Sequence, residues 1–132
     1  YEIRLSLVGS EMCIRDSSML GTGLVILLFV IFHILDLTLG VQPAASGAFE
    51  SGSAYANLVA SFQRPVVALF YMLTMLVLTV HVAHGTWTAA NDLGATGRRL
   101  RQLAAWVAGL VAMAICLGNI SIPVLVLLGV IQ

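Results

Sequence analysis

The sequence predicts an all-α fold, a transmembrane helical bundle with three membrane helices. The chain is 60% hydrophobic and only 9% charged, whereas a soluble domain carries about 25% charged residues. Its apolar residues gather in three stretches, each reaching the roughly 20 residues needed to cross a bilayer core of about 30 Å. The net charge is zero, which argues against a nucleic-acid partner. The composition therefore indicates an integral membrane protein in contact with lipid.

The N-terminal segment, residues 1–17, is set apart from the fold prediction. Residues 7–17 read LVGSEMCIRDS, which is similar to the translation of a sequencing-library adapter. A scar of this kind is excluded from fold reasoning; the alternative is a genuine polar segment that precedes a helix. We predict that residues 1–17 are non-native, that residues 18–132 form the membrane domain, and that the natural protein extends further upstream.

The first predicted membrane helix covers about residues 19–41 and contains His33 and Asp36. An ionisable side chain in hydrocarbon is costly, so its default interpretation is functional. His33 is a candidate ligand for haem iron, because a neutral imidazole is the usual axial ligand of that metal. Asp36 is a candidate contact for a quinone or a haem propionate, or a proton relay, but the favoured interpretation is a carboxylate that reaches outer water from the helix end.

The second predicted membrane helix covers about residues 65–87 and contains His81 and His84. His81 lies deeper in the bilayer, where a ligand role best explains it. His84 follows three residues later, so both imidazoles can share one helical face; it is a candidate for a haem propionate or for the cytoplasmic interface. Arg64 precedes this helix and is a candidate partner for a propionate or lipid headgroup, although a simple interfacial charge is favoured.

The third predicted membrane helix covers about residues 103–131, which is long for one straight crossing. Pro123 lacks an amide hydrogen, so a kink is predicted there. A short amphipathic helix is expected near Tyr55 and Phe62.

The loops predict the orientation of the bundle. Loop 88–102 contains three arginines, and the positive-inside rule places it in the cytoplasm. Loop 42–64 then lies outside, and the first helix runs from inside to outside.

The depths of the histidines argue for two separate haem sites. A neutral imidazole is the usual axial ligand of haem iron. His33 lies ~18 Å from the cytoplasmic end of its helix and His81 ~24 Å from the outer end of its own, so their heights differ by roughly 10 Å. Such a pair cannot easily share one iron and suits two haems stacked across the membrane. The alternative is that these imidazoles hydrogen-bond neighbouring helices; spacing alone does not choose between His81 and His84.

Three strings carry a family resemblance: LLFVIFHILDLTLG, NLVASFQRPVVALFYMLTMLVLTVHVAHGTW and ISIPVLVLLGVI. They resemble the last three helices of the succinate dehydrogenase (complex II) cytochrome b subunit, of the dihaem type with five membrane helices. The resemblance implies an anchor in the bacterial cytoplasmic membrane that joins iron–sulfur and flavoprotein subunits. It would not be catalytic alone. It would carry electrons through two b haems to a quinone, with His33 on the distal iron and His81 on the proximal iron.

Alternatives from other classes remain open. The anchor of a quinol:fumarate reductase runs the same electron path in reverse, and other dihaem cytochromes b anchor formate dehydrogenases or hydrogenases. A small non-haem transporter would instead keep the histidines for helix packing or proton relay. The presence or absence of a b-type absorption band separates the carriers from the transporter.

Overall fold

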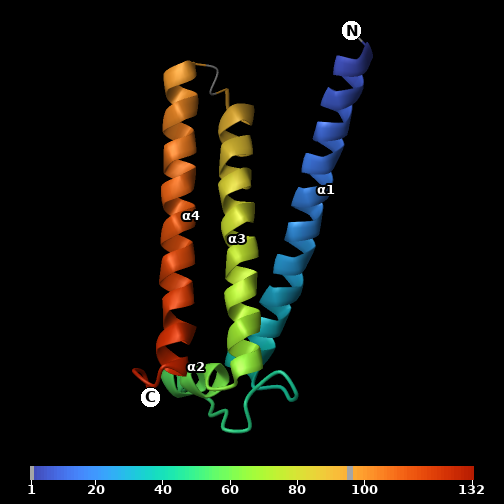
Figure 1. The fold of residues 1–132 in the computed structure, drawn as a ribbon. Helices are drawn as coiled ribbons and strands as arrows, with labels where there is room; N and C mark the ends of the chain where they lie inside the picture. Colours follow the sequence, from blue (N-terminus) through green and yellow to red (C-terminus); the bar gives the residue numbers. More distant parts are fainter. Residues whose placement is uncertain (1, 95–96) are drawn as a thin grey trace.

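The computed structural model describes the backbone of residues 2–94 and 97–132 and the side chains of residues 17–94 and 97–132. Over that part of the chain every regular element is helical, as predicted. Three long helices stand side by side, and a π-helical segment and one short helix lie at a single end of the bundle (Figure 1). In chain order the elements are α1 (Glu2–His33), η1 (Ile34–Leu39), α2 (Ala54–Phe62), α3 (Pro65–Asp92) and α4 (Arg98–Leu127).

The prediction of three membrane helices is confirmed. Each of α1 with η1, α3 and α4 is long and apolar enough to cross a bilayer, with mean hydropathies of 2.4, 2.2 and 2.4. α3 continues to Asp92 and α4 already begins at Arg98, so both extend into the predicted loop, whose arginines and glutamine are good helix formers. α4 continues through Pro123 and ends at Leu127, short of the predicted end at 131.

The first helix starts much earlier than predicted. α1 begins at Glu2 and runs unbroken through the segment assigned as non-native; no proline interrupts this stretch, so the backbone can stay helical. Immediately after His33 the helix widens into η1. Gly40 then ends it with a φ of 67° and donates its N–H to the Leu35 carbonyl. Wider turns of this kind are frequent at functional sites.

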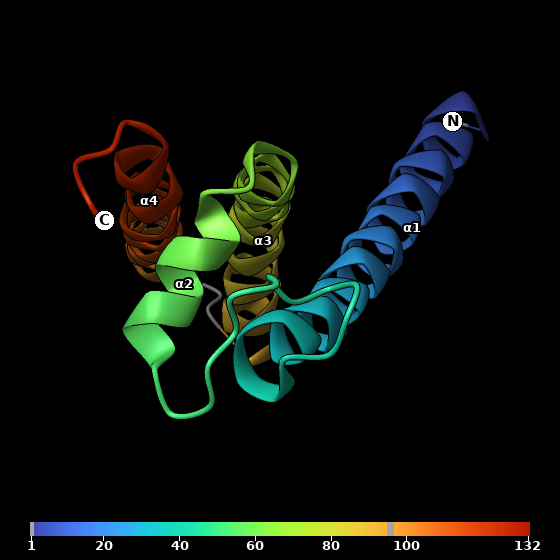
Figure 2. The ribbon, with the colours of Figure 1, turned by 90° about the horizontal axis from the view of Figure 1, so that it is seen from below.

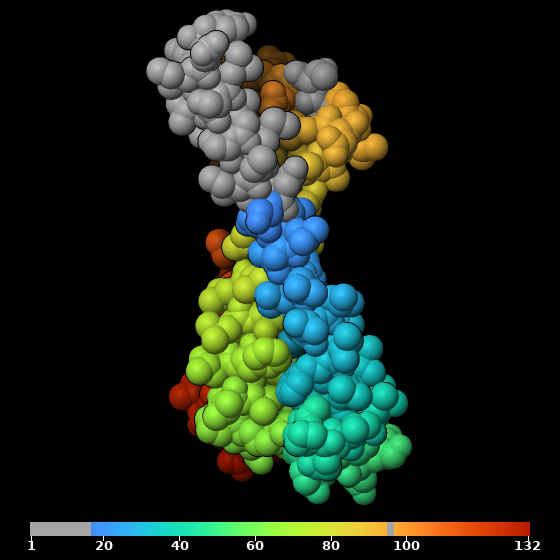
Figure 3. Space-filling model, turned by 90° about the vertical axis from the view of Figure 1, so that its right-hand side faces the viewer, coloured from blue at the N-terminus to red at the C-terminus, as the bar shows by residue number. Residues whose placement is uncertain are grey.

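α3 and α4 form the best-packed pair of long helices. α3 packs most extensively against α4 and less extensively against α1. Ala108 and Ala112 of α4 are only 3% and 4% exposed, and small residues let helix backbones approach closely in a membrane. α1 leans away from the pair (Figure 1). It meets α3 from the end that carries η1 up to the level of His81 and Gly85 (Figure 3).

The short helix expected near Tyr55 and Phe62 is present as α2, which lies across the end of the bundle (Figure 2). Phe62 is buried against the core, whereas Tyr55 is exposed. The loop before α2 is fastened by Asn57, whose side-chain amide accepts from the Glu50 N–H and donates to the Glu50 carbonyl, both at 2.8 Å. α2 therefore covers the end of the bundle at which His33 and Asp36 lie.

Candidate functional site

Two histidines on different helices each face a hydroxyl group across the α1–α3 interface. His33 of α1 places its Nδ1 3.4 Å from the Tyr71 hydroxyl of α3. His81 of α3 places its Nδ1 2.9 Å from the Thr22 hydroxyl of α1. The two contacts have the same form, with the helices exchanging roles. In each case Nδ1 of the ring forms the hydrogen bond, and Nε2 has no hydrogen-bond partner among the described side chains.

The hydrogen-bond pattern is compatible with the same tautomer at both rings. A hydroxyl has one proton to donate. The Thr22 hydroxyl lies 2.9 Å from the Ser18 carbonyl and 3.1 Å from the Met19 carbonyl, and the Tyr71 hydroxyl donates to Asp36 at 3.0 Å. With the hydroxyl protons directed to these acceptors, each oxygen can accept from the Nδ1–H of its histidine. The tautomer that results has an unprotonated Nε2, which is the form of imidazole that binds a metal.

The two rings lie at different heights in the bundle. His33 is level with Tyr71, and α3 rises ~15 Å from Tyr71 to His81 at 1.5 Å per residue. This separation exceeds the roughly 10 Å expected from the sequence. The two imidazoles are thus too far apart along the membrane normal to face a single metal atom.

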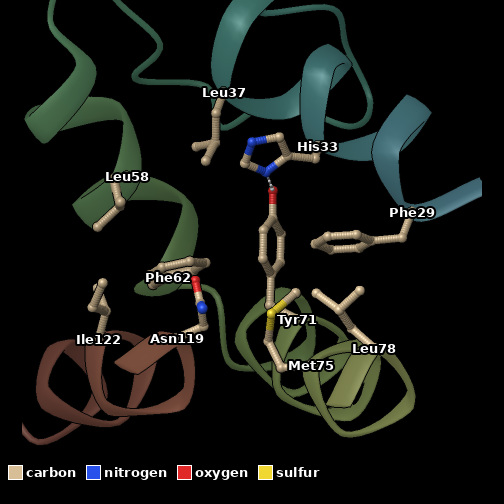
Figure 4. Close-up of a pocket in the computed structure, with 10 residues that line it drawn as sticks. All are labelled: Phe29, His33, Leu37, Leu58, Phe62, Tyr71, Met75, Leu78, Asn119 and Ile122. Carbon is tan, nitrogen blue, oxygen red and sulfur yellow. Dashed lines mark hydrogen bonds between the residues drawn. The ribbon is translucent and has the colours of Figure 1, made fainter. Parts of the chain in front are cut away.

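A cavity of about 220 Å³ lies beside His33, where α1, η1, α2, α3 and α4 converge. Figure 4 shows the His33 ring next to the Tyr71 hydroxyl, with Phe29 to one side and Asn119 of α4 across the cavity. The His33 ring is itself exposed on the surface of the chain. The cavity is lined by Phe29, His33, Leu37, Leu58, Phe62, Tyr71, Met75, Leu78, Asn119 and Ile122.

His81 is half-buried where α1 approaches closely. A Cβ added at Gly23 would lie 3.6 Å from Cε1 of His81, an ordinary van der Waals contact, so α1 and the ring lie next to each other here. Gly85 faces the Met19 side chain in the same way, at 3.8 Å. His84 is also half-buried, but among the described side chains no hydrogen bond reaches its ring. Of the two neighbouring histidines, His81 is the one whose orientation is fixed.

Asp36 is 1% exposed, so the interpretation that it reaches outer water is wrong. Its Oδ1 accepts from Arg64 at 2.7 Å. Its Oδ2 accepts from the hydroxyls of Tyr71, at 3.0 Å, and Ser61. Burying a carboxylate is costly unless it is paired and hydrogen-bonded, and these donors meet both conditions. Asp36 lies within η1, whose turn carries it into the bundle, Ser61 comes from the end of α2, and Arg64 caps the start of α3.

Arg64 is more than the simple interfacial charge that was favoured. Its Nη2 donates to Asp36 and, at 3.0 Å, to Ser61, while its Nη1 donates to the Ala44 carbonyl at 2.9 Å. The cation therefore ties the loop after η1 to the buried carboxylate. Over the described residues, Arg64 Nε is the buried side-chain nitrogen or oxygen that lacks a hydrogen-bond partner.

The arginine-bearing loop lies at the far end of the bundle from Asp36 and α2 (Figure 1). There the Arg101 guanidinium stands 5.6 Å from the centroid of the Trp87 ring. In the part of the chain with described side chains, no group of three or more His, Cys, Asp or Glu residues could hold a bare metal ion. Haem iron does not need such a group, because one imidazole on each face suffices.

The comparisons with known proteins assign the family. A family model described as the succinate dehydrogenase/fumarate reductase transmembrane subunit matches residues 15–118. The chain belongs to this family. The match includes His33, His81 and the Asp36–Arg64 pair. No curated protein and no solved structure matches the chain. As a transmembrane subunit of this family, the protein is an integral membrane anchor that associates with the other subunits of its complex.

Two site residues, Thr22 and Tyr71, were missed by the sequence analysis. Tyr71 carried a usable signal, since a hydroxyl within an apolar helix needs a partner when buried. Thr22 carried none, because a threonine in a helix ordinarily bonds a carbonyl of the preceding turn. Its contact with His81 depends on how α1 and α3 pack.

Proposed function

We propose that the protein is the haem-bearing membrane anchor of a succinate:quinone oxidoreductase. It would carry electrons from the iron–sulfur subunit through two b haems to a quinone, with the flavoprotein subunit supplying the electrons. The observation that carries the proposal is the pair of imidazoles at different heights, each held by Nδ1 and each keeping Nε2 free. When bound, haem supplies the one-electron redox centres.

The residues at both sites fit a haem. His33 is exposed and lines a cavity, so there is space beside its imidazole. The Arg64 side chain is 31% exposed and suits a propionate, since guanidinium groups bind carboxylates well. At the other site, the Thr22 hydroxyl of α1 engages the Nδ1 side of the His81 ring at 2.9 Å. The chain's own part is to ligate and orient each iron through one imidazole.

The packing of α1 is consistent with further helices around it. Only 6% of its apolar window is buried, against 22% for α3. In the dihaem type with five membrane helices, two additional helices would cover this face and supply the second axial ligand of each iron. His33 would serve the distal haem and His81 the proximal haem, with His84 as the alternative to His81.

We propose that the anchor lies in a bacterial cytoplasmic membrane, with loop 88–102 in the cytoplasm and loop 42–64 outside. Cytoplasmic arginines are the physical basis for this orientation. His81 then lies on the side of the iron–sulfur subunit and His33 on the outer side. Of the two candidates for a quinone or propionate contact, Arg64 is the stronger, because both carboxylate oxygens of Asp36 are already occupied.

Substitution of each histidine in the complete complex tests the ligand assignment. His33→Ala and His81→Ala should each remove one of the two haems, with different losses in the reduced-minus-oxidised spectrum, whereas His84→Ala should keep both. Retention of both haems by His81→Ala, together with loss of one by His84→Ala, would transfer the assignment to His84. A wild-type complex without a b-type band would exclude the haem function.

Quinol:fumarate reductase is the second candidate, because the family description names both enzymes. The anchor has the same parts in either case. Measured rates of succinate oxidation and fumarate reduction by the purified complex, with a quinone and a quinol respectively, distinguish the two directions.

A further inference from the structure

We infer that Tyr71, supported by Asp36, is a positioning residue that lowers the redox potential of the iron bound by His33. The inference rests on the proposed function, because it concerns the strength of a ligand that the proposal assigns. It starts from the chain of hydrogen bonds that begins at His33 Nδ1, passes through the Tyr71 hydroxyl and ends at the Asp36 carboxylate.

The two histidines differ in the group that accepts the hydrogen bond from their hydroxyl partner. The Thr22 hydroxyl beside His81 donates to uncharged backbone carbonyls. The Tyr71 hydroxyl beside His33 donates to a carboxylate. Hydrogen bonds in a chain polarise one another, so a hydroxyl that donates to a carboxylate becomes a better acceptor for the histidine N–H. The end group thus distinguishes two sites that otherwise look alike.

A stronger acceptor at Nδ1 makes the imidazole a more basic ligand at Nε2. A more electron-rich ligand stabilises ferric iron relative to ferrous iron, and the potential falls. Arg64 neutralises the charge of Asp36 at 2.7 Å, which limits any effect of net charge. The influence on His33 therefore passes through the Tyr71 hydrogen bond, and removal of that hydroxyl should raise the potential.

The packing of the Tyr71 ring does not depend on its hydroxyl. The residue is 5% exposed, and its ring makes edge-to-face contacts with Phe62 and Phe29 at centroid distances of 4.9 and 5.1 Å. Tyr71→Phe preserves these contacts and deletes one oxygen. Thr22→Val is the matched control, since it removes the hydroxyl beside His81 at nearly constant shape.

The test is a potentiometric titration of both haems in the complete complex, followed by optical and electron paramagnetic resonance spectroscopy. We expect Tyr71→Phe to raise the midpoint potential of the His33 haem, to change its resonance signal and to leave the His81 haem unchanged. Thr22→Val should produce a smaller shift, confined to the His81 haem. Asp36→Asn combined with Arg64→Gln, which removes the carboxylate without changing the net charge of the pair, should shift the His33 haem in the same direction as Tyr71→Phe.

Two results would overturn the inference: unchanged potentials in Tyr71→Phe, or equal shifts of both haems. If Tyr71→Phe lost the His33 haem altogether, the charge-balanced variant Asp36→Asn with Arg64→Gln would decide, and an unchanged potential there would equally refute the role. The failure of the proposed function looks different, because it leaves the unsubstituted complex without any b-type signal to titrate.

Discussion

Gly40 occupies a position at which the backbone conformation and a neighbouring ring both disfavour any side chain. It ends η1 with a φ of 67°, a left-handed conformation in which a Cβ costs roughly 1–2 kcal/mol. An added Cβ would also overlap the Phe49 ring, whose Cγ would lie 2.6 Å away. We expect Gly40→Ala to lower the free energy of unfolding by about 2 kcal/mol or more, measured by thermal unfolding in detergent.

Gly21→Ala is the control for that substitution. No atom would lie within 4 Å of the new Cβ, and alanine is better than glycine inside a helix by about 1 kcal/mol. This variant should be unchanged or slightly more stable. Equal destabilisation of both variants would show that the Gly40 conformation and the Phe49 contact are not what matters.

The sequence singled out His33, His81, Asp36 and Arg64 because charge and imidazole are conspicuous in apolar helices. It missed how they are connected. The pairing of Asp36 with Arg64 depends on a loop and α2 folding back over η1, and no local pattern encodes that return. The same holds for the hydroxyl partners of the histidines, which lie on another helix. Residue types were therefore predictable, whereas their partners were not.

At the scale of elements, the Asn57 side chain of α2 fastens the last part of the loop before that helix. Asn57 is 3% exposed and bonds both backbone groups of Glu50. Asn57→Ala removes both bonds, and each buried group left without a partner costs about 1–3 kcal/mol. We expect a loss of about 2 kcal/mol in stability and faster proteolysis of the loop at residues 47–53, read from the fragments of a limited digest.

Asn91→Ala provides the comparison, because Asn91 donates only to the Trp87 carbonyl of its own helix, at 2.9 Å. Its loss should leave both stability and the digest close to those of the unsubstituted protein. A digest of Asn57→Ala that also stayed unchanged would argue against the proposed tether.

The helices themselves were predictable to different degrees. Membrane spans follow from apolar length, and α2 followed from two aromatic residues in a polar loop. The ends were less accurate: α1 starts at Glu2 and α4 stops at Leu127. The π-helical turn after His33 had no counterpart in the prediction, because one extra residue per turn leaves no clear trace in hydrophobic periodicity. Yet this turn carries Asp36 into the bundle.

At the scale of the whole molecule, the α3–α4 pair depends on small side chains. Ala112 is 4% exposed on the helix that packs mainly against α3. Ala112→Leu inserts extra carbons into a filled interface, a change that typically costs about 1–3 kcal/mol. We expect a matching loss of thermal stability in detergent. Ala114→Leu places the same side chain at an exposed position and should have little effect; similar losses in both variants would contradict this packing.

The fold class and the number of membrane helices could be predicted because hydrocarbon imposes a strict minimum length on any span. The arrangement of the helices could not. α1 packs on α3 and leans away from α4 (Figure 2), and that choice is made by contacts such as Thr22 with His81 and Phe29 with Tyr71. Such contacts join residues far apart along the chain.

The sparse packing of α1 has a consequence for biogenesis. With 6% of its apolar window buried, α1 gains little stability from packing against the other helices after it leaves the translocon. By contrast, α3 and α4 can pack against each other as soon as both have been inserted. A subunit that has not assembled into its complex would therefore expose α1 and its imidazole to lipid. This exposed face of α1 is where membrane quality-control proteases would recognise the unassembled subunit.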